Sequence, residues 1–125
     1  MQFPDNLKYT DSHEWVKIEG DVAIVGITEF AQGELGDVVF VDIPEARAVA
    51  VGESFGSIEA VKTVSDLIAP IGGTITEINP ELDGSPEIVN SDPYGAGWMV
   101  KMTIDSMDEF NALLDVEQYK ALIGK

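Results

Sequence analysis

The chain of 125 residues has seven Lys and Arg against 23 Asp and Glu, and its formal charge of -16 disfavours nucleic acid and anionic lipid as partners. With 45% hydrophobic residues and no apolar run near the eighteen or so residues of a membrane span, it is expected to form one globular domain, residues 1–125. The absence of cysteine excludes disulfides and thiolate sites, and the N-terminal stretch lacks the features of a signal or transit peptide, so we expect a cytoplasmic protein.

Short runs rich in Val, Ile and Thr follow one another from Glu14 to Ile104, separated by Gly, Asp, Asn or Pro. Such spacing is typical of a mainly β sandwich or barrel. The first two runs, "HEWVKIE" and "VAIVGI", flank "GD" and predict a hairpin. Its buried face is expected to contain Trp15, Ile18, Val22 and Ile24. The later strands are expected within "DVVFVDI", which ends at Pro44, and within "ESFGSIEAV", "DLIAPI", "GTITEIN" and "GWMVKMTI".

A short helix is predicted near residues 28–35, between the second and third of these runs. Thr28 is a suitable N-cap for "EFAQGEL", and Gly36 is expected to end the helix in the left-handed conformation. Gly33 lies inside the segment and weakens its helix propensity.

Two short helices are predicted at the C-terminus, packed against a sheet. "SMDE" has the form of a capping box, with Ser106 as the N-cap and Glu109 three residues later. Asp115 is expected to cap "VEQYKALI", with Gln118 at the third position and Gly124 beyond the end.

The residues that commonly build an active site are scarce in this sequence. The single histidine, His13, has no cysteine or second histidine to complete a nucleophilic triad or a zinc site. The many carboxylates are spread over turns and strand faces, and no glycine-rich loop opens a helix to hold a phosphate. We therefore expect no catalytic residue, no metal and no enzyme activity in the chain.

One of the six lysines, Lys62, is placed between two predicted strands in "FGSIEAVKTVSDLIAPIGG". Most turn lysines are solvated and have no further role. A lysine that is to be acylated as a swinging arm needs a rigid two-stranded base, an exposed ammonium and neighbours that a modifying enzyme recognises, and this segment offers all three.

The segment "GSIEAVKTVSDLIAPIGGTITEIN" resembles the attachment region of lipoyl domains, in which an acidic residue precedes the lysine by three positions, as Glu59 does here. Biotinyl domains share the hairpin but have methionine on both sides of the lysine, where this chain has Val61 and Thr63. The resemblance therefore implies lipoate as the cofactor, covalently bound to Lys62, with Glu59, Val61 and Thr63 as its recognition context.

Two longer segments narrow the resemblance to glycine cleavage H proteins. "LKYTDSHEWVKIEGDVAIVGITEFAQGELGDVVFVDIPE" is similar to the N-terminal half of that family, and "INPELDGSPEIVNSDPYGAGWMVKM" is similar to a later part. The C-terminal helical pair is similar too, so the resemblance covers nearly the whole chain. Thr63 departs from the alanine that is usual there, and "PEARAVAVGES" replaces a more usual glycine-containing loop.

The resemblance implies a flattened barrel-sandwich, the hammerhead fold of lipoyl domains, and a carrier in glycine catabolism and one-carbon metabolism. Such a carrier takes the aminomethyl group of glycine from a pyridoxal-phosphate glycine decarboxylase to a tetrahydrofolate-dependent aminomethyltransferase. A dihydrolipoyl dehydrogenase then reoxidises it. A lipoate ligase or lipoyl transferase would load Lys62, and the chain is expected to be a monomer.

The resemblance also implies a cleft that receives the loaded arm and protects it from water. Ser12, Glu14 and Asp66 match the family positions suggested for that cleft, where carboxylates and a hydroxyl suit an ammonium group. Glu14 alternates with Trp15 along its strand, so we expect Glu14 to face solvent and Trp15 to be buried.

Two other interpretations remain open at this stage. The chain could be an H-like protein that relays lipoate, or another lipoyl carrier module. It could also be an acidic interaction domain that is never modified.

Overall fold

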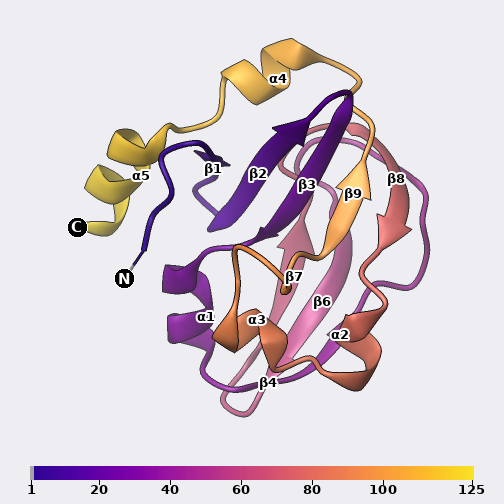
Figure 1. Cartoon of the computed structure of the whole chain (residues 1–125), viewed down its shortest axis with the longest axis vertical. Helices are drawn as coiled ribbons and strands as arrows, with labels where there is room; N and C mark the ends of the chain where they lie inside the picture. The colour runs from indigo at the N-terminus through magenta and orange to yellow at the C-terminus, as the bar shows by residue number, and fades with distance from the viewer. Residues whose placement is uncertain (1) are drawn as a thin grey trace.

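The computed structural model describes residues 2–125, over which nine strands and five helices are formed (Figure 1). The strands are β1 (Lys8–Tyr9), β2 (Glu14–Glu19), β3 (Val22–Ile27), β4 (Val38–Asp42), β5 (Ala48–Val49), β6 (Ser54–Ala60), β7 (Val64–Ile68), β8 (Gly73–Ile78) and β9 (Val100–Met102). The helices are α1 (Glu29–Leu35), α2 (Glu81–Gly84), α3 (Ile88–Ser91), α4 (Met107–Asn111) and α5 (Val116–Ile123).

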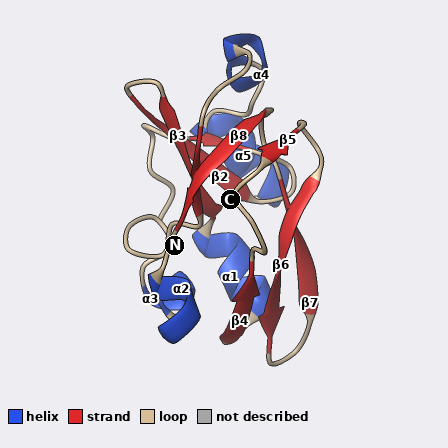
Figure 2. Cartoon of the chain, turned by 90° about the vertical axis from the view of Figure 1, so that its right-hand side faces the viewer, coloured by secondary structure: helices blue, strands red, loops and turns tan. Residues whose placement is uncertain are grey.

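The strands form two antiparallel sheets, in the orders β1-β2-β3-β9-β8-β5 and β4-β6-β7. Figure 2 shows β6 and β7 along one side of the molecule, with β2 and β3 on the other. The mainly β class with short helices, predicted from the sequence, is confirmed. Over residues 2–125 the hydrogen-bonded strands make a sandwich of two separate sheets.

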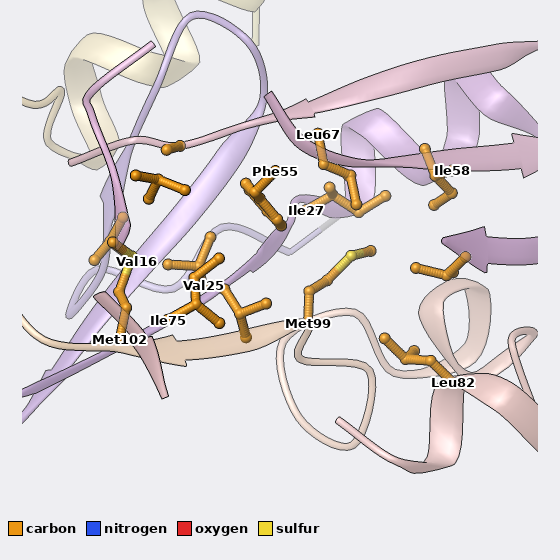
Figure 3. Packing of buried hydrophobic residues seen from close by; sticks show 14 of the residues in the cluster. Val16, Val25, Ile27, Phe55, Ile58, Leu67, Ile75, Leu82, Met99 and Met102 are labelled. Atoms are coloured by element: carbon orange, nitrogen blue, oxygen red, sulfur yellow. The ribbon is translucent and has the colours of Figure 1, made fainter. Parts of the chain in front are cut away.

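The main core fills the space between the two sheets (Figure 3). Val16 and Val25 of the larger sheet and Phe55, Ile58 and Leu67 of the smaller sheet are each at most 3% exposed. Side chains of Val, Leu, Ile and Phe gain about 1.5–3 kcal/mol each from full burial, so this layer holds the two sheets together.

The β2–β3 hairpin forms as predicted, with Gly20 at a φ of 64° in the turn. The predicted buried face is wrong, because its residues lie on both faces of the hairpin. Ile18 packs against the main core, together with Ala23 and Val25, whereas Ile24 packs beside Trp15 in a second cluster that includes Tyr9 and Tyr119. Helix α5 and the N-terminal segment cover the outer face of β2, so both faces are apolar and alternation alone could not identify the inner one.

Helix α1 begins where predicted, because Thr28 Oγ1 accepts a hydrogen bond from Ala31 N–H at 3.1 Å. Gly36 ends the helix with φ 83° and ψ -157°, an extended mirror-image conformation instead of the left-handed helical one that we expected. This conformation turns the chain away from the helix and directly into β4.

The two predicted C-terminal helices are α4 and α5. In α5 the capping box between Asp115 and Gln118 is complete, with both hydrogen bonds present. The expected capping box of α4 is wrong, because Ser106 makes no side-chain cap. Glu109 Oε1 instead accepts a hydrogen bond from Gly72 N–H at 2.8 Å, which ties α4 to the entrance of β8.

Helices α2 and α3 and strands β1 and β5 were not predicted. The two helices have only four residues each, and Asn79 Oδ1 accepts a hydrogen bond from Glu81 N–H at the start of α2. Elements of two to four residues have too few side chains for a periodic pattern. Within residues 2–125, no helix is long and apolar enough to cross a membrane.

Candidate functional site

The β6–β7 hairpin places Lys62 at its tip, at the end of the molecule opposite α4 (Figures 1 and 2). Glu59 pairs with Val64, and Ala60 N–H donates to Thr63 O at 2.8 Å, so that Val61 and Lys62 form the corners of the turn. The turn is anchored to the segment before β4, because Val61 N–H donates to Asp37 O at 3.0 Å. Lys62 is thus displayed on a braced two-stranded base.

The side chain of Lys62 lies over Gly36, at the end of α1. A Cβ atom added at Gly36 would come within 2.9 Å of Lys62 Cε and 3.6 Å of Nζ. Among residues 2–125, the salt bridges within 4.0 Å are made by Lys17, Arg47, Lys101 and Lys120, so the exposed Lys62 ammonium is not neutralised by a carboxylate. Its amine is therefore accessible from solvent.

The three residues expected to form the recognition context surround this tip. Val61 is 73% exposed, and Thr63 and Glu59 are exposed as well. Glu59 is paired with Phe40 on one side and Val64 on the other, so its side chain lies on the outer face of the smaller sheet.

A pocket of about 170 Å³ brings Ser12, Glu14 and Asp66 together, although they come from the segment before β2, from β2 itself and from β7. Apolar side chains form much of its wall, namely those of Ile27, Ala31, Leu35, Ile58 and Leu67. The polar lining also includes His13, Glu34 and Ser65. The pocket combines apolar walls with several carboxylates and hydroxyls, which suits a hydrocarbon chain that ends in a cation.

The register of β7 places the side chains of Ser65 and Asp66 on opposite faces of the strand. Ser65 pairs with Ile58, which is 1% exposed, whereas Asp66 pairs with Ser57. Because successive strand residues point to opposite faces, Ser65 shares the inner face with Ile58, and Asp66 borders the pocket from the edge of the sheet. The sequence analysis missed Ser65, since a serine at an exposed strand end has no distinguishing signal.

Glu14 is 3% exposed, so the expectation that it faces solvent is wrong. Its carboxylate accepts a hydrogen bond from Thr10 Oγ1 at 2.7 Å and a long one from Ile68 N–H at 3.5 Å. Burial raises the pKa of Glu14 from 4.5 to about 7, and the two hydrogen bonds offset only part of this effect. Burial thus favours the protonated form of this side chain far more than in an exposed glutamate.

His13 joins the pocket wall to the C-terminal helix. Its φ of 70° is the only positive value at a non-glycine residue within residues 2–125. Its Nδ1 is hydrogen-bonded to the hydroxyl of Tyr119 at 3.0 Å, and that hydroxyl also lies 2.8 Å from Thr28 Oγ1. Burial lowers the pKa of His13, which favours the neutral imidazole in this contact. The position of Tyr119, more than a hundred residues away in the sequence, could not be predicted from the residues around His13.

A second pocket of about 370 Å³ adjoins the first, since Ser12 and Glu14 line both. Its walls come from β1, from residues 68–70 and from the α4–α5 linker at residues 112–114. Glu14 thus lies at the junction of the two pockets. No group of three or more His, Asp and Glu residues suited to a metal ion occurs among residues 2–125.

The comparisons with known proteins agree over nearly the whole chain. A family model described as glycine cleavage H-protein matches residues 7–125. The chain is 55% identical over 125 residues to the glycine cleavage system H protein of Bacteroides fragilis, with 99% of each chain covered. It is 53% identical over 126 residues to that of Staphylococcus carnosus, with 100% of each covered.

The structure of a relative has the same fold. The crystal structure of a glycine cleavage system H protein from Mycobacterium marinum matches with a TM-score of 0.86 at 40% identity, covering 98% of this chain and 100% of that one. The chain therefore belongs to the glycine cleavage H-protein family, the lipoyl-carrying and non-catalytic component of the glycine cleavage system.

Proposed function

We propose that Lys62 carries lipoate in amide linkage and that residues 1–125 act as one carrier domain. The observation that carries this proposal is the exposed Lys62 ammonium at a braced hairpin tip, next to the end of α1. The lysine lies over Gly36, and the preceding residue, Leu35, lines the pocket of Ser12, Glu14 and Asp66. An acyl extension of Lys62 therefore starts beside the pocket.

The residues present fit the group. The apolar walls suit the hydrocarbon part of lipoate, and the carboxylates and hydroxyls suit the primary ammonium of an aminomethyl group. When bound, lipoate supplies a ring disulfide whose dihedral angle is far from the relaxed value, so that it is reduced more easily than an open-chain disulfide.

The residues of this chain bind the aminomethyl group and shield it from water. Glu14 and Asp66 offer negative charge to the ammonium, Ser12 offers a hydroxyl, and Ile27 and Leu35 limit the access of water to the pocket. Because the group remains tethered, it meets each partner at an effective concentration set by the length of the arm.

The partners proposed for this role are the glycine decarboxylase, the aminomethyltransferase and the dihydrolipoyl dehydrogenase, together with a lipoate ligase or lipoyl transferase. Glu59, Val61 and Thr63 are the proposed recognition residues around the lysine.

The modification can be tested by measuring the intact mass of protein expressed with lipoate. We expect a shift equal to one lipoyl group that is lost in Lys62→Arg and retained in Lys17→Arg, which changes a strand lysine paired with Glu19. A chain that stays unmodified with an active ligase would contradict the proposal and favour an unmodified interaction domain.

The carrier role can be tested with the lipoylated protein and the decarboxylase. Glycine should cause reduction of the arm, and adding the aminomethyltransferase with tetrahydrofolate should release ammonia. A lipoylated protein that is inactive with both enzymes, but donates lipoate to other acceptors, would instead support the H-like relay.

A further inference from the structure

The tip of the lysine hairpin, residues 61–63, is hydrogen-bonded to the body of the protein at one point. Within residues 2–125, the tip makes a single hydrogen bond to a segment outside its own hairpin, from Val61 N–H to Asp37 O at 3.0 Å. The bond from Ala60 N–H to Thr63 O stays inside the hairpin. The orientation of the tip relative to the body therefore depends on where Asp37 lies.

Asp37 follows a glycine, whose backbone is intrinsically free to adopt many conformations. Gly36 ends α1 with φ 83° and ψ -157°, which other residues rarely adopt. The side chain of Lys62 lies over this glycine, since a Cβ added at Gly36 would be 2.9 Å from Lys62 Cε. A movement of Gly36 would thus shift both the hydrogen bond at Asp37 and the surface beneath the lysine.

One side chain holds the peptide groups on both sides of Asp37. Asn90 Nδ2 donates to Gly36 O at 2.9 Å, and Asn90 Oδ1 accepts a hydrogen bond from Val38 N–H at 2.8 Å. Asn90 Nδ2 also donates to Gln32 Oε1 at 2.9 Å. The amide nitrogen thus faces two acceptors and the amide oxygen faces one donor, so the hydrogen bonds fix the orientation of the amide.

The peptide group between Asp37 and Val38 connects Asn90 to the hairpin directly. Its N–H donates to Asn90, and its C=O accepts the hydrogen bond from Val61 N–H. A peptide group is planar and rigid, and its N–H and C=O point in opposite directions. By holding the N–H, Asn90 also sets the direction of the carbonyl that holds the hairpin tip.

The position of Asn90 is fixed by the packing of its own helix. Asn90 belongs to α3, which lies beside α1 (Figure 1). The preceding residue, Val89, is fully buried in the main core, and Asn90 N–H donates to Glu87 O at 3.0 Å. The side chain of Asn90 therefore connects the core to the base of the lysine through a short series of contacts.

We propose that Asn90 is a positioning residue that sets the root of the lipoyl arm relative to the smaller pocket. This inference rests on the proposed function, in which Lys62 carries the arm. Asn90 does not line that pocket, but Leu35, which precedes Gly36, does. The segment that Asn90 holds thus joins the pocket wall to the base of the arm. When this contact is lost, the root moves relative to the pocket and a loaded arm spends less time inside it.

The test pairs Asn90 with Asn79, an asparagine that makes the same kinds of contact elsewhere. Asn79 Nδ2 donates to the carbonyl oxygens of Ala96 and Trp98, and Asn79 Oδ1 accepts a hydrogen bond from Glu81 N–H. Asn90→Asp and Asn79→Asp each replace two donors by an oxygen and add one negative charge. Asn90→Ser and Asn79→Ser shorten the side chain without adding a charge, and they keep the comparison possible if the aspartate variants do not fold.

The first measurement is amide hydrogen exchange of the full, unmodified chain, followed by nuclear magnetic resonance. In Asn90→Asp we expect Val61 N–H to exchange roughly tenfold faster than in the wild type, because its acceptor is no longer held in place. The exchange of Ala60 N–H, which is bonded within the hairpin, should change by less than about twofold. In Asn79→Asp the ratio of the two exchange rates should keep its wild-type value.

The second measurement uses the lipoylated protein after the decarboxylase has loaded the arm from glycine. The loaded arm should decay roughly threefold faster or more in Asn90→Asp, followed by ammonia release, because a displaced root lowers the fraction of arms in the pocket. Asn79→Asp should stay within about twofold of the wild type. Reduction of the unloaded arm by dithiothreitol needs no pocket, and its rate should be the same in all variants.

Three results would overturn the inference. Wild-type exchange at Val61 in a folded Asn90→Asp or Asn90→Ser protein would show that Asn90 does not hold the hairpin. Faster exchange at Val61 with unchanged decay of the loaded arm would show that this contact does not position the arm. An equal acceleration of exchange at Val61 and Ala60 would indicate a general loss of stability instead.

Failure of the proposed function gives a different result. A wild-type protein that is never lipoylated would refute the proposed function, and with it the role of Asn90 in positioning an arm. The exchange rates of the unmodified chain would in that case still decide whether Asn90 holds the hairpin.

Discussion

Thr10 Oγ1 donates a 2.7 Å hydrogen bond to Glu14 Oε1, and Glu14 is only 3% exposed. The second contact, from Ile68 N–H, is long at 3.5 Å. One short bond from a neutral hydroxyl does not replace the hydration of a carboxylate, so burial raises the pKa of Glu14 to about 7. The pocket wall therefore changes charge near neutral pH.

The raised pKa predicts that Glu14 makes the folded protein less stable as the pH rises. Between the ordinary pKa of 4.5 and the folded value of about 7, the folded state holds a proton that the unfolded state has released. The free energy of unfolding therefore falls as the pH rises through this window and levels off above it. Glu14→Gln removes this dependence and should be more stable than the wild type by up to about 3 kcal/mol at pH 8.

Urea unfolding at pH 4 and pH 8 measures this difference. The two proteins should differ much less at pH 4, where Glu14 is largely protonated in both states. The exposed Glu19→Gln provides a control without a buried group. A difference between Glu14→Gln and the wild type that is the same at both pH values would refute the prediction.

The protonation state of Glu14 is also expected to control how firmly the pocket holds the ammonium of an aminomethyl group on the lipoyl arm. An ammonium near Glu14 favours the carboxylate and lowers the pKa of Glu14, so retention of the arm should weaken as the pH falls below about 7. The decay of the arm-bound aminomethyl group, followed by ammonia release, should accelerate in the wild type as the pH falls, with a midpoint below 7 because the ammonium lowers the pKa of Glu14. In Glu14→Gln decay should be fast and lose this pH dependence, and Asp66→Asn should accelerate it with the midpoint retained.

Two glycines of the α1 segment are predicted to respond in opposite directions to alanine. Gly33 is in the helix body with no atom within 4 Å of an added Cβ, so Gly33→Ala should stabilise the protein by about 0.5–1 kcal/mol. Gly36 has φ 83° and ψ -157°, so Gly36→Ala should destabilise it by about 1–3 kcal/mol.

The free energy of unfolding in urea checks both glycine variants. The clash of a Cβ at position 36 with Lys62 adds little to the loss, because the lysine side chain is flexible and can move aside. Lipoylation of Gly36→Ala should therefore persist, and a stability equal to that of the wild type would contradict the argument from backbone conformation.

The hydroxyl of Tyr119 is predicted to stabilise the attachment of α5. The hydroxyl lies 2.8 Å from Thr28 Oγ1 and 3.0 Å from His13 Nδ1, and Tyr119 is fully buried. Tyr119→Phe keeps the ring stacked on Tyr9 but leaves His13 without this partner, so it should cost about 1–2 kcal/mol. Thermal unfolding should show a clear loss, whereas Leu122→Gln on the exposed side of the same helix should change stability by less than about 0.5 kcal/mol.

Local features of this protein were predictable because they depend on neighbouring residues. The turn at Gly20, the cap at Thr28 and the box of Asp115 with Gln118 each form within three or four residues, and each is confirmed. The capping box expected between Ser106 and Glu109 does not form, because the Glu109 carboxylate accepts a hydrogen bond from the distant Gly72 N–H instead. A local motif predicts structure only when no tertiary partner takes its side chain.

By itself the sequence determined the family, the mainly β class and the place of Lys62 in a turn between two strands, since these follow from ordered motifs and from a period of two. The tertiary structure alone decided that both faces of β2 are buried, and thereby that Glu14 lies in a pocket wall with a raised pKa. The alternation of side chains along a strand shows only that neighbouring residues point to opposite faces of the sheet. Whether a face is covered depends on segments that are far away in the sequence. Here α1, β7 and the α4–α5 linker provide that cover.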